Sequence, residues 1–195
     1  ECGFETPRWG GKCPQCDAWN TLEEKIETKA SSVKLATTSF ASGRRMKDVS
    51  VTKDNRILTG ISEFDRVLGG GMVVDSFNLL SAPPGCGKST LAIMVADKML
   101  KNGYNVLYAS GEESASQIKN RATRLQLENI DEMLIVDNSN LDFVLEEVEK
   151  YDVDFIVLDS IQTFYLNEFL PSKQGNPTQT NGVVSALKDL CKQSG

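Results

Sequence analysis

A glycine-rich turn decides what kind of fold this sequence is able to form. Its residues are Pro84-Gly85-Cys86-Gly87-Lys88-Ser89-Thr90. The turn lies between a short apolar run, Ser76–Ser81, and a stretch with helical spacing of apolar residues, Ser89–Leu100. Glycines between a strand and a helix let several backbone N–H groups converge on one phosphate, and the helix start adds its dipole. The pattern predicts a phosphate-binding loop in an α/β domain.

Two side chains of this turn are suited to a nucleoside triphosphate. Lys88 offers a point charge for the terminal phosphates, and the Ser89 hydroxyl suits Mg²⁺. The turn departs from G-x-x-x-x-G-K-[ST] only where Ala82 replaces the first glycine, a mild change at the edge of an element. The competing interpretation is a glycine turn that caps a helix, with Lys88 on the surface.

Strands alternate with helices in the rest of the chain from Arg56 onward. This order is typical of βαβ units with a parallel sheet and right-handed crossovers. A polar loop is expected from Leu166 to Thr180, and Gly103 is expected to end the first helix. The further strands are expected over Asn105–Ser110, Met133–Val136 and Asp154–Asp159, and the further helices over Ser114–Leu125, Leu141–Lys150 and about Val183 to Lys192.

Carboxylates follow two of the expected strands. Asp159 ends the apolar run FIVLD, at the sheet edge where parallel sheets bind ligands, and suits the Mg²⁺ shell. Glu112 and Glu113 follow the strand NVLYAS, where a carboxylate is able to orient or deprotonate an attacking water. For these glutamates the competing interpretation is acids that offset the dipole of the next helix. We favour a functional role for Glu112 and leave Glu113 open between the two interpretations.

Three of the five cysteines lie within the first 16 residues. Cys13 and Cys16 form a C-x-x-C turn, and Cys2 lies ten intervening residues before it. Zinc requires four tetrahedral ligands, so a further cysteine two residues before Glu1 would complete a C-x-x-C pair. A redox C-x-x-C is the alternative, but that motif needs a βα context, which this turn-rich segment lacks.

Composition excludes several classes of protein. The chain has no histidine, which removes Ser-His-Asp and Cys-His catalysis and every His-ligated metal site. With 21 basic and 27 acidic residues the net charge is −6, so a basic field over the whole chain is absent. No apolar run is long enough to span a membrane, and cysteines without a secretory signal indicate a cytoplasmic protein.

Several segments together resemble the bacterial RadA (Sms) family of RecA-superfamily DNA repair ATPases. The resemblance covers residues 1 to about 165, and the order of the modules is that of the family. The segments that carry it are ECGFETPRWGGKCPQCDAWNTLEE, RILTGISEFDRVLGGG, PPGCGKSTL, LYASGEES and IVLDSIQTFY.

The resemblance implies a cysteine zinc finger over residues 1–22 and a RecA-like ATPase core over 56–195. Residues 23–55 are rich in Ser, Thr and Lys, a composition that predicts a linker with little regular structure. The resemblance further implies ATP, Mg²⁺ and Zn²⁺ as ligands, single-stranded or branched DNA as a partner, a hexameric ring, and a role beside a recombinase in branch migration after DNA damage. Glu112 matches the catalytic glutamate, Gln162 matches a polar position beyond Asp159, and Lys88, Ser89 and Asp159 match the nucleotide and Mg²⁺ ligands.

The resemblance also implies that this chain is a fragment. The first zinc cysteine lies outside it, and the family's later core strand and Lon-protease-like domain are missing after Gly195. That later strand would lie between the strands that end at Ser81 and Asp159. We therefore expect an incomplete parallel sheet, and we expect residues 1–195 alone to hydrolyse no ATP and to fold poorly.

Two other functions stay open at this stage. One is a RecA-superfamily signalling ATPase without a DNA role, although such proteins usually lack a cysteine module. The other is a zinc-dependent nucleic-acid adaptor with an inactive phosphate-binding loop, although Lys88, Ser89, Glu112 and Asp159 are all present. A DNA-stimulated ATPase assay on the full-length protein separates these readings.

Overall fold

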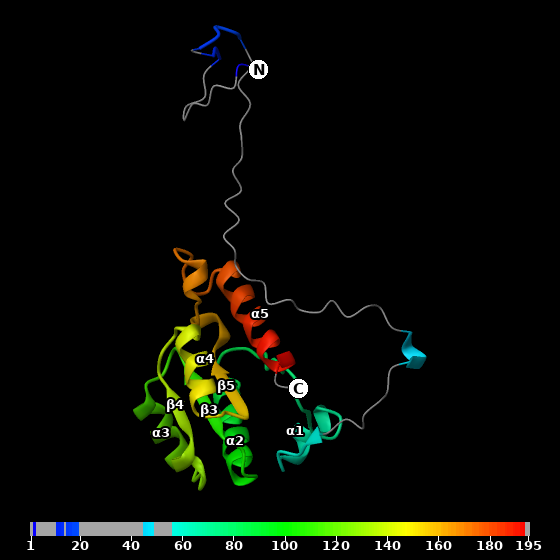
Figure 1. Cartoon of the computed structure of the whole chain (residues 1–195). Coiled ribbons are helices and arrows are strands. Elements are labelled where there is room, and N and C mark those ends of the chain that lie inside the picture. Colours follow the sequence, from blue (N-terminus) through cyan, green and yellow to red (C-terminus); the bar gives the residue numbers. More distant parts are fainter. Residues whose placement is uncertain (1, 3–10, 14, 20–44, 49–55, 194–195) are drawn as a thin grey trace. The chain divides into compact units, whose positions relative to one another are not determined.

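The chain forms two compact units, Glu1–Val51 and Thr52–Gly195. The computed structural model describes residues 2, 11–13, 15–19, 45–48 and 56–193 (Figure 1). In the first unit, Lys12 and Trp19 form an antiparallel bridge, and a 3-10 turn, η1, spans Met46–Asp48. Most of the predicted linker, residues 23–55, lies outside the described residues, so the expectation of little regular structure there stays a prediction.

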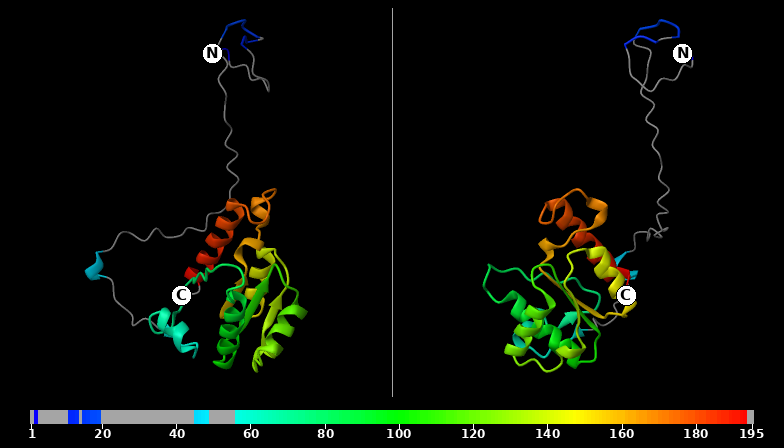
Figure 2. Two further views of the ribbon diagram at one scale, coloured as in Figure 1. Left: turned by 180° about the vertical axis from the view of Figure 1, so that it is seen from behind. Right: turned by 90° about the vertical axis from the view of Figure 1, so that its left-hand side faces the viewer.

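A parallel three-stranded sheet organises the second unit, as the alternation of strands and helices predicts. Its strands are β3 (Val106–Ser110), β4 (Leu134–Val136) and β5 (Phe155–Asp159), in the order β4-β3-β5. The register pairs Ser110 with Asp159, so β3 and β5 end at the same edge. The helices are α2 (Lys88–Lys101), α3 (Ala115–Arg124), α4 (Leu141–Lys150) and α5 (Pro177–Gln193) (Figures 1 and 2).

Shorter elements complete the unit. A two-stranded antiparallel sheet joins β1 (Arg56–Ile57) to β2 (Met72–Val73), with helix α1 (Ser62–Val67) between them. Three 3-10 turns follow later in the chain: η2 (Ile130–Glu132), η3 (Ile161–Thr163) and η4 (Asn167–Phe169). In the part of the chain that the structure describes, no helix is both long enough and apolar enough to cross a bilayer.

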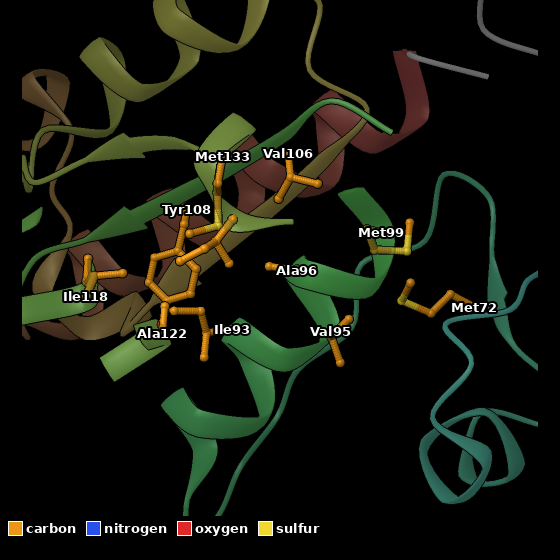
Figure 3. Close-up of a cluster of buried hydrophobic side chains, with 11 residues drawn as sticks. Met72, Ile93, Val95, Ala96, Met99, Val106, Tyr108, Ile118, Ala122 and Met133 are labelled. Atoms are coloured by element: carbon orange, nitrogen blue, oxygen red, sulfur yellow. The ribbon is translucent and has the colours of Figure 1, made fainter. Parts of the chain in front are cut away.

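Side chains of the sheet alternate between two hydrophobic clusters, as the twofold repeat of a strand requires. On β3, Val106 and Tyr108 contribute to one cluster, while Leu107 and Ala109 contribute to the other. The first cluster includes Ile93 and Ala96 of α2 and Ile118 and Ala122 of α3 (Figure 3). The second includes Leu141, Val144 and Val148 of α4 and Val183 and Leu187 of α5. The sheet is therefore covered on both faces, and β3 is buried along its whole length.

The last helix begins earlier than the sequence analysis predicts. It starts at Pro177 rather than near Val183, so the expected loop from Leu166 to Thr180 is shorter. The physical reason is a helix start signal in a polar segment, which the spacing of apolar residues does not reveal. Asn176 Oδ1 accepts a hydrogen bond from the Thr178 amide at 2.9 Å, and proline suits the first helical position because its fixed φ is helical.

The strand predicted over Ser76–Ser81 is wrong, because the segment forms no ladder. Among the described residues β5 pairs with β3 alone, and no strand pairs with residues 76–81. A strand is held by hydrogen bonds to a neighbouring strand, so an apolar run without such a neighbour does not form one. Phe77 still packs against the second cluster, whereas Leu79 and Leu80 are 69% and 46% exposed.

A buried carboxylate organises the turn between β1 and α1. Asp65 accepts hydrogen bonds from the Thr59 amide and hydroxyl at 2.9 and 2.7 Å, and from the Gly60 amide at 3.0 Å. Burial acts to raise the pKa of Asp65, but these hydrogen bonds lower it overall, so the group stays ionised. The Asp65 carbonyl also accepts from the Gly70 and Gly71 amides, which ties the glycine turn before β2 to the same residue.

Asp65→Ala is expected to destabilise this unit by about 2 kcal/mol or more, because it leaves buried donors without an acceptor. The measurement is the thermal unfolding of the full-length protein and of this variant. Glu63→Ala is the matched control, since Glu63 lies on the same helix and its side chain forms an exposed ion pair with Arg66. Equal midpoints for the two variants would contradict a structural role for Asp65.

Candidate active site

The glycine-rich turn has the backbone shape that a phosphate-binding loop requires. Gly85 and Gly87 have φ values of 80° and 82°, in the left-handed region that glycine enters without strain. Gly87 is the N-cap of α2, and its carbonyl accepts the first helical hydrogen bond from Leu91 at 2.9 Å. The first amides of α2 therefore begin at the turn, where they and the helix dipole favour an anion.

Lys88 lies against its own loop. Its ammonium donates to the Ala82 carbonyl at 2.8 Å and to the Pro83 carbonyl at 3.1 Å. These carbonyls hold the charge within the turn rather than in open solvent. Lys88 is half-buried, and so are Ser89 and Thr90, the next two residues of α2.

Glu112 and Asp159 lie together at the carboxyl edge of the sheet, as the sequence predicts. The Gly111 amide donates to the Asp159 carbonyl at 3.2 Å, which places the turn after β3 beside the end of β5. The Ser160 hydroxyl donates to Glu112 Oε1 at 2.7 Å. Glu112 is exposed to solvent at this edge. It is therefore accessible to a water molecule, and one hydrogen bond orients it.

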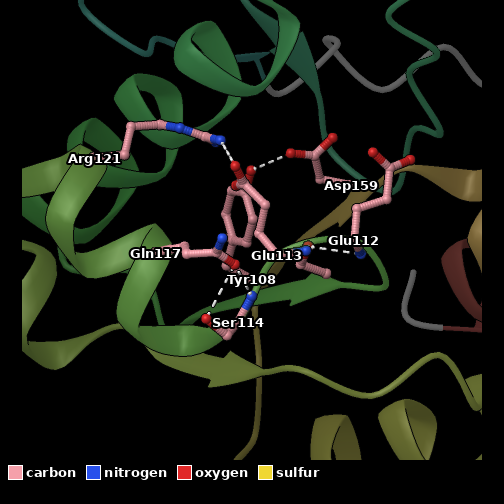
Figure 4. A network of polar contacts seen from close by, with 8 residues as sticks. Tyr108, Glu112, Glu113, Ser114, Gln117, Arg121 and Asp159 are labelled. Atoms are coloured by element: carbon pink, nitrogen blue, oxygen red, sulfur yellow. Dashed lines mark hydrogen bonds and ion pairs between the residues drawn. The ribbon is translucent and has the colours of Figure 1, made fainter.

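Glu113 has a different environment from Glu112. It forms an ion pair with Arg121 of α3, and the two side chains are 30% and 14% exposed (Figure 4). In the described part of the chain, Glu113 Oε2 and Arg121 Nη1 are buried without a further hydrogen-bond partner. The ion pair ties the start of α3 to its last turn. Glu113 thus pairs with a cation, whereas Glu112 accepts its hydrogen bond from the neutral Ser160 hydroxyl.

Gly111 must be glycine at this edge. A Cβ there would overlap the Thr163 hydroxyl and approach Ser139 Oγ to 2.9 Å. Thr163 in turn donates to the Ser160 carbonyl at 2.7 Å. The close approach of Gly111 to this segment brings Ser160 within reach of Glu112.

A tyrosine that the sequence analysis missed joins the network. The hydroxyl of Tyr108, a fully buried residue of β3, donates to Asp159 Oδ2 at 2.7 Å (Figure 4). Burial, together with the hydrogen bond to Asp159, raises the pKa of Tyr108 far above its usual value, so the hydroxyl keeps its proton.

The structure groups some predicted residues and not others. Glu112 and Asp159 share one edge, whereas among the described residues no hydrogen bond or ion pair joins the side chains of the turn 84–90 to either carboxylate. Helix α2, which carries the turn at its start, nevertheless packs on β3 and β5. Gln162 lies exposed in η3 beyond Asp159. No residue pattern pointed to Tyr108, Ser160 or Arg121, because their partners lie 51, 48 and 8 positions away in the chain.

The cysteines of the first unit converge on one point. The thiol sulfurs of Cys2, Cys13 and Cys16 lie within 4.8 Å of one another, and the Cys2 and Cys13 sulfurs are 3.6 Å apart. Thiolates around a tetrahedral Zn²⁺ lie about 3.8 Å apart, given a Zn–S distance near 2.3 Å. The three thiols therefore fit the zinc site that the sequence predicts.

Local backbone geometry also favours a metal ligand at Cys13. The amides of Cys16 and Gln15 point at the Cys13 sulfur and lower its pKa to about 7. The Cys13 amide donates to Ala18 at 2.9 Å, and the Asp17 amide donates back to Cys13 at 3.0 Å. Asp17 has a φ of 59°, which tightens the turn after Cys16. A thiol that ionises near neutral pH is readily available to Zn²⁺.

The full-length protein is expected to contain one Zn²⁺ per chain, and Cys13→Ser should remove most of it. The physical reason is that a hydroxyl replaces the thiolate with the most favourable backbone surroundings. Elemental analysis of purified protein provides the measurement. Cys86→Ser is the control, because Cys86 is exposed and lies in the other unit. Absence of zinc from the parent protein would contradict the assignment.

The sequence profile of the AAA domain family matches residues 43–195. The chain belongs to this family. A rubredoxin metal binding domain profile matches residues 1–24, which contain the three clustered cysteines. The expected architecture, an α/β core of the RecA type preceded by a small zinc-finger module, is thereby confirmed.

Curated relatives extend this result along the chain. It is 40% identical to a DNA repair protein RadA of Streptococcus pyogenes serotype M3 over 98% of the chain and 42% of the relative. It is 36% identical to that of Bacillus subtilis, over 100% and 43%, and 38% identical to that of Aquifex aeolicus, over 99% and 42%. The resemblance to bacterial RadA is confirmed, and the chain spans about two fifths of the length of these relatives.

Proposed function

We propose that this chain is the zinc-binding and nucleotide-binding part of a DNA repair ATPase that hydrolyses ATP in response to single-stranded DNA. The observation that carries the proposal is the arrangement at one sheet edge. Glu112 and Asp159 lie together at the ends of two adjacent parallel strands, and the helix that packs on these strands starts with a left-handed glycine turn. The relatives, named as DNA repair proteins, support the biological setting.

Each residue of the candidate site has its own role in this proposal. Backbone amides from Gly85 to Thr90, in the turn that follows Pro84, bind the phosphates of ATP together with Lys88. Ser89 and Asp159 hold Mg²⁺, an ion that neutralises charge on the phosphate oxygens when it is bound. Glu112 orients the attacking water and accepts its proton, for which its exposed carboxylate is suited.

The zinc unit and the ATPase core have separate tasks in this proposal. The core drives branch migration of recombination intermediates as a hexamer, beside a recombinase, and the cysteine unit contributes to DNA binding. The chain's net charge of −6 requires that DNA contacts come from local basic surfaces.

The deciding experiment measures ATP hydrolysis by the full-length protein with and without single-stranded DNA. Stimulation by single-stranded DNA, but not by an equal concentration of a non-nucleic polyanion such as heparin, is the expected result. Turnover that DNA leaves unchanged would favour a signalling ATPase. Zinc and DNA binding without turnover would favour an adaptor with an inactive nucleotide site.

A further inference from the structure

The Tyr108 side chain reaches from β3 to Asp159, the last residue of the neighbouring strand β5. Tyr108 is paired with Val157 in the register, so Asp159 is its diagonal neighbour on the same face of the sheet. An aromatic side chain is long enough to reach a diagonal neighbour on the adjacent strand. Tyr108 Oη donates to Asp159 Oδ2 at 2.7 Å.

The hydrogen bond makes the two oxygens of Asp159 unequal. Oδ2 accepts from Tyr108, whereas Oδ1 accepts no hydrogen bond from the residues that the structure describes. A carboxylate held through one oxygen keeps the other at a fixed place and in a fixed orientation. A ligand of Mg²⁺ benefits from this, because Mg²⁺ demands nearly ideal octahedral geometry.

Arg121 does not replace Tyr108 in this role. Its guanidinium is paired with Glu113. The Arg121–Glu113 ion pair therefore borders the site without holding Asp159 (Figure 4). Tyr108 is the residue that orients Asp159 from within the sheet.

We propose that Tyr108 is a positioning residue for the Mg²⁺ of this ATPase, acting through Asp159. The inference rests on the proposed function, which makes Asp159 a Mg²⁺ ligand. A buried tyrosine hydroxyl also needs a partner for purely structural reasons. The two roles differ in what they affect: a structural role changes stability alone, whereas a positioning role changes the concentration of Mg²⁺ that the site requires.

The test uses Tyr108→Phe in the full-length protein and the Mg²⁺ dependence of binding of a fluorescent ATP analogue. The half-saturating Mg²⁺ concentration is expected to rise about tenfold, the lower end of what loss of a metal ligand's hydrogen-bond partner costs. Electron paramagnetic resonance of Mn²⁺ in the presence of ATP should show weaker metal binding by a similar factor. Tyr104→Phe makes the same chemical change before the amino end of β3 and is expected to leave both measurements unchanged.

A second variant restores the donor. Tyr108→4-aminophenylalanine keeps the ring and places an N–H group where the hydroxyl was, so it should return the Mg²⁺ dependence close to that of the parent. A lowered unfolding midpoint with an unchanged Mg²⁺ dependence in Tyr108→Phe would overturn the inference. So would failure of the amino variant to restore a shifted Mg²⁺ dependence.

Asp159→Asn separates this inference from the proposed function. If Asp159→Asn shifts the Mg²⁺ dependence and Tyr108→Phe does not, the role of Tyr108 is wrong and the Mg²⁺ site stands. If neither variant shifts the Mg²⁺ dependence, Asp159 is not a Mg²⁺ ligand, and both the role of Tyr108 and the proposed Mg²⁺ site are wrong. A shift in both variants supports the role of Tyr108 and the Mg²⁺ site alike.

Discussion

Lys88→Ala is expected to reduce ATP hydrolysis by the full-length protein at least about 100-fold, as expected when a charge that stabilises the transition state is lost. Lys88 already lies inside the glycine turn, where it donates to the carbonyls of Ala82 and Pro83. ATP offers phosphate oxygens as stronger acceptors at the same turn. Without the ammonium, nucleotide binding should be weaker and the transition state should be less stabilised. Both the affinity and the turnover should therefore fall.

Two further variants make this result specific. Lys88→Arg keeps the charge but not the compact shape of an ammonium, and it should also hydrolyse ATP poorly. Lys101→Ala is the matched control, because Lys101 is exposed at the opposite end of α2. Steady-state hydrolysis and equilibrium binding of a fluorescent ATP analogue are the measurements. Normal turnover in Lys88→Ala would refute the phosphate-binding assignment of this turn.

The sequence predicted most helices and strands because they bury apolar faces with a clear period. Helix α4 has the bounds that the spacing predicts, and α3 begins at Ala115, one residue after the predicted start at Ser114. The start of α5 was missed because its signal, Asn176 followed by Pro177, lies in a polar segment without an apolar period. The period of apolar residues marks the buried face of a helix, so it does not locate a helix start whose first turn is polar.

The unpaired segment 76–81 shows a different limit of sequence analysis. Its composition suits a strand, but whether a strand forms depends on a neighbour from elsewhere in the protein. The exposure of Leu79 and Leu80 fits a segment whose backbone pairs with no strand among the described residues. The local sequence indicates that the segment is able to form a strand, but a strand forms only where a neighbouring strand provides hydrogen-bond partners.

For the candidate site, the sequence predicted the groups that are proposed to touch ligands and missed the groups that hold these side chains in place. Motif spacing identifies Lys88, Glu112 and Asp159, because such groups follow a glycine turn or end a strand. It does not identify Tyr108 or Ser160, since hydrogen bonds between strands leave no short-range pattern. Hydrogen bonds of this kind depend on which residues of neighbouring strands are paired, and only the structure shows that pairing.

Glu112→Gln is expected to keep ATP binding and lose most hydrolysis, with turnover falling about 100-fold or more, as loss of a general base does. The amide keeps the size of the side chain, and Gln still accepts a hydrogen bond from Ser160, but it is unable to take a proton from water. Because Glu112 is exposed, the unfolding midpoint should change little.

Glu113→Gln should give the opposite pattern and thereby tests the assignment between the two neighbours. Its carboxylate pairs with the mostly buried Arg121, so neutralising it leaves a cation without its partner and should lower the unfolding midpoint. Hydrolysis should fall less than in Glu112→Gln, since Glu113 is occupied by that ion pair. Single-turnover hydrolysis and thermal unfolding, measured side by side on both variants, separate the two roles. A reversal, with hydrolysis lost in Glu113→Gln and kept in Glu112→Gln, would move the catalytic role to Glu113 and make the ion pair with Arg121 part of the mechanism.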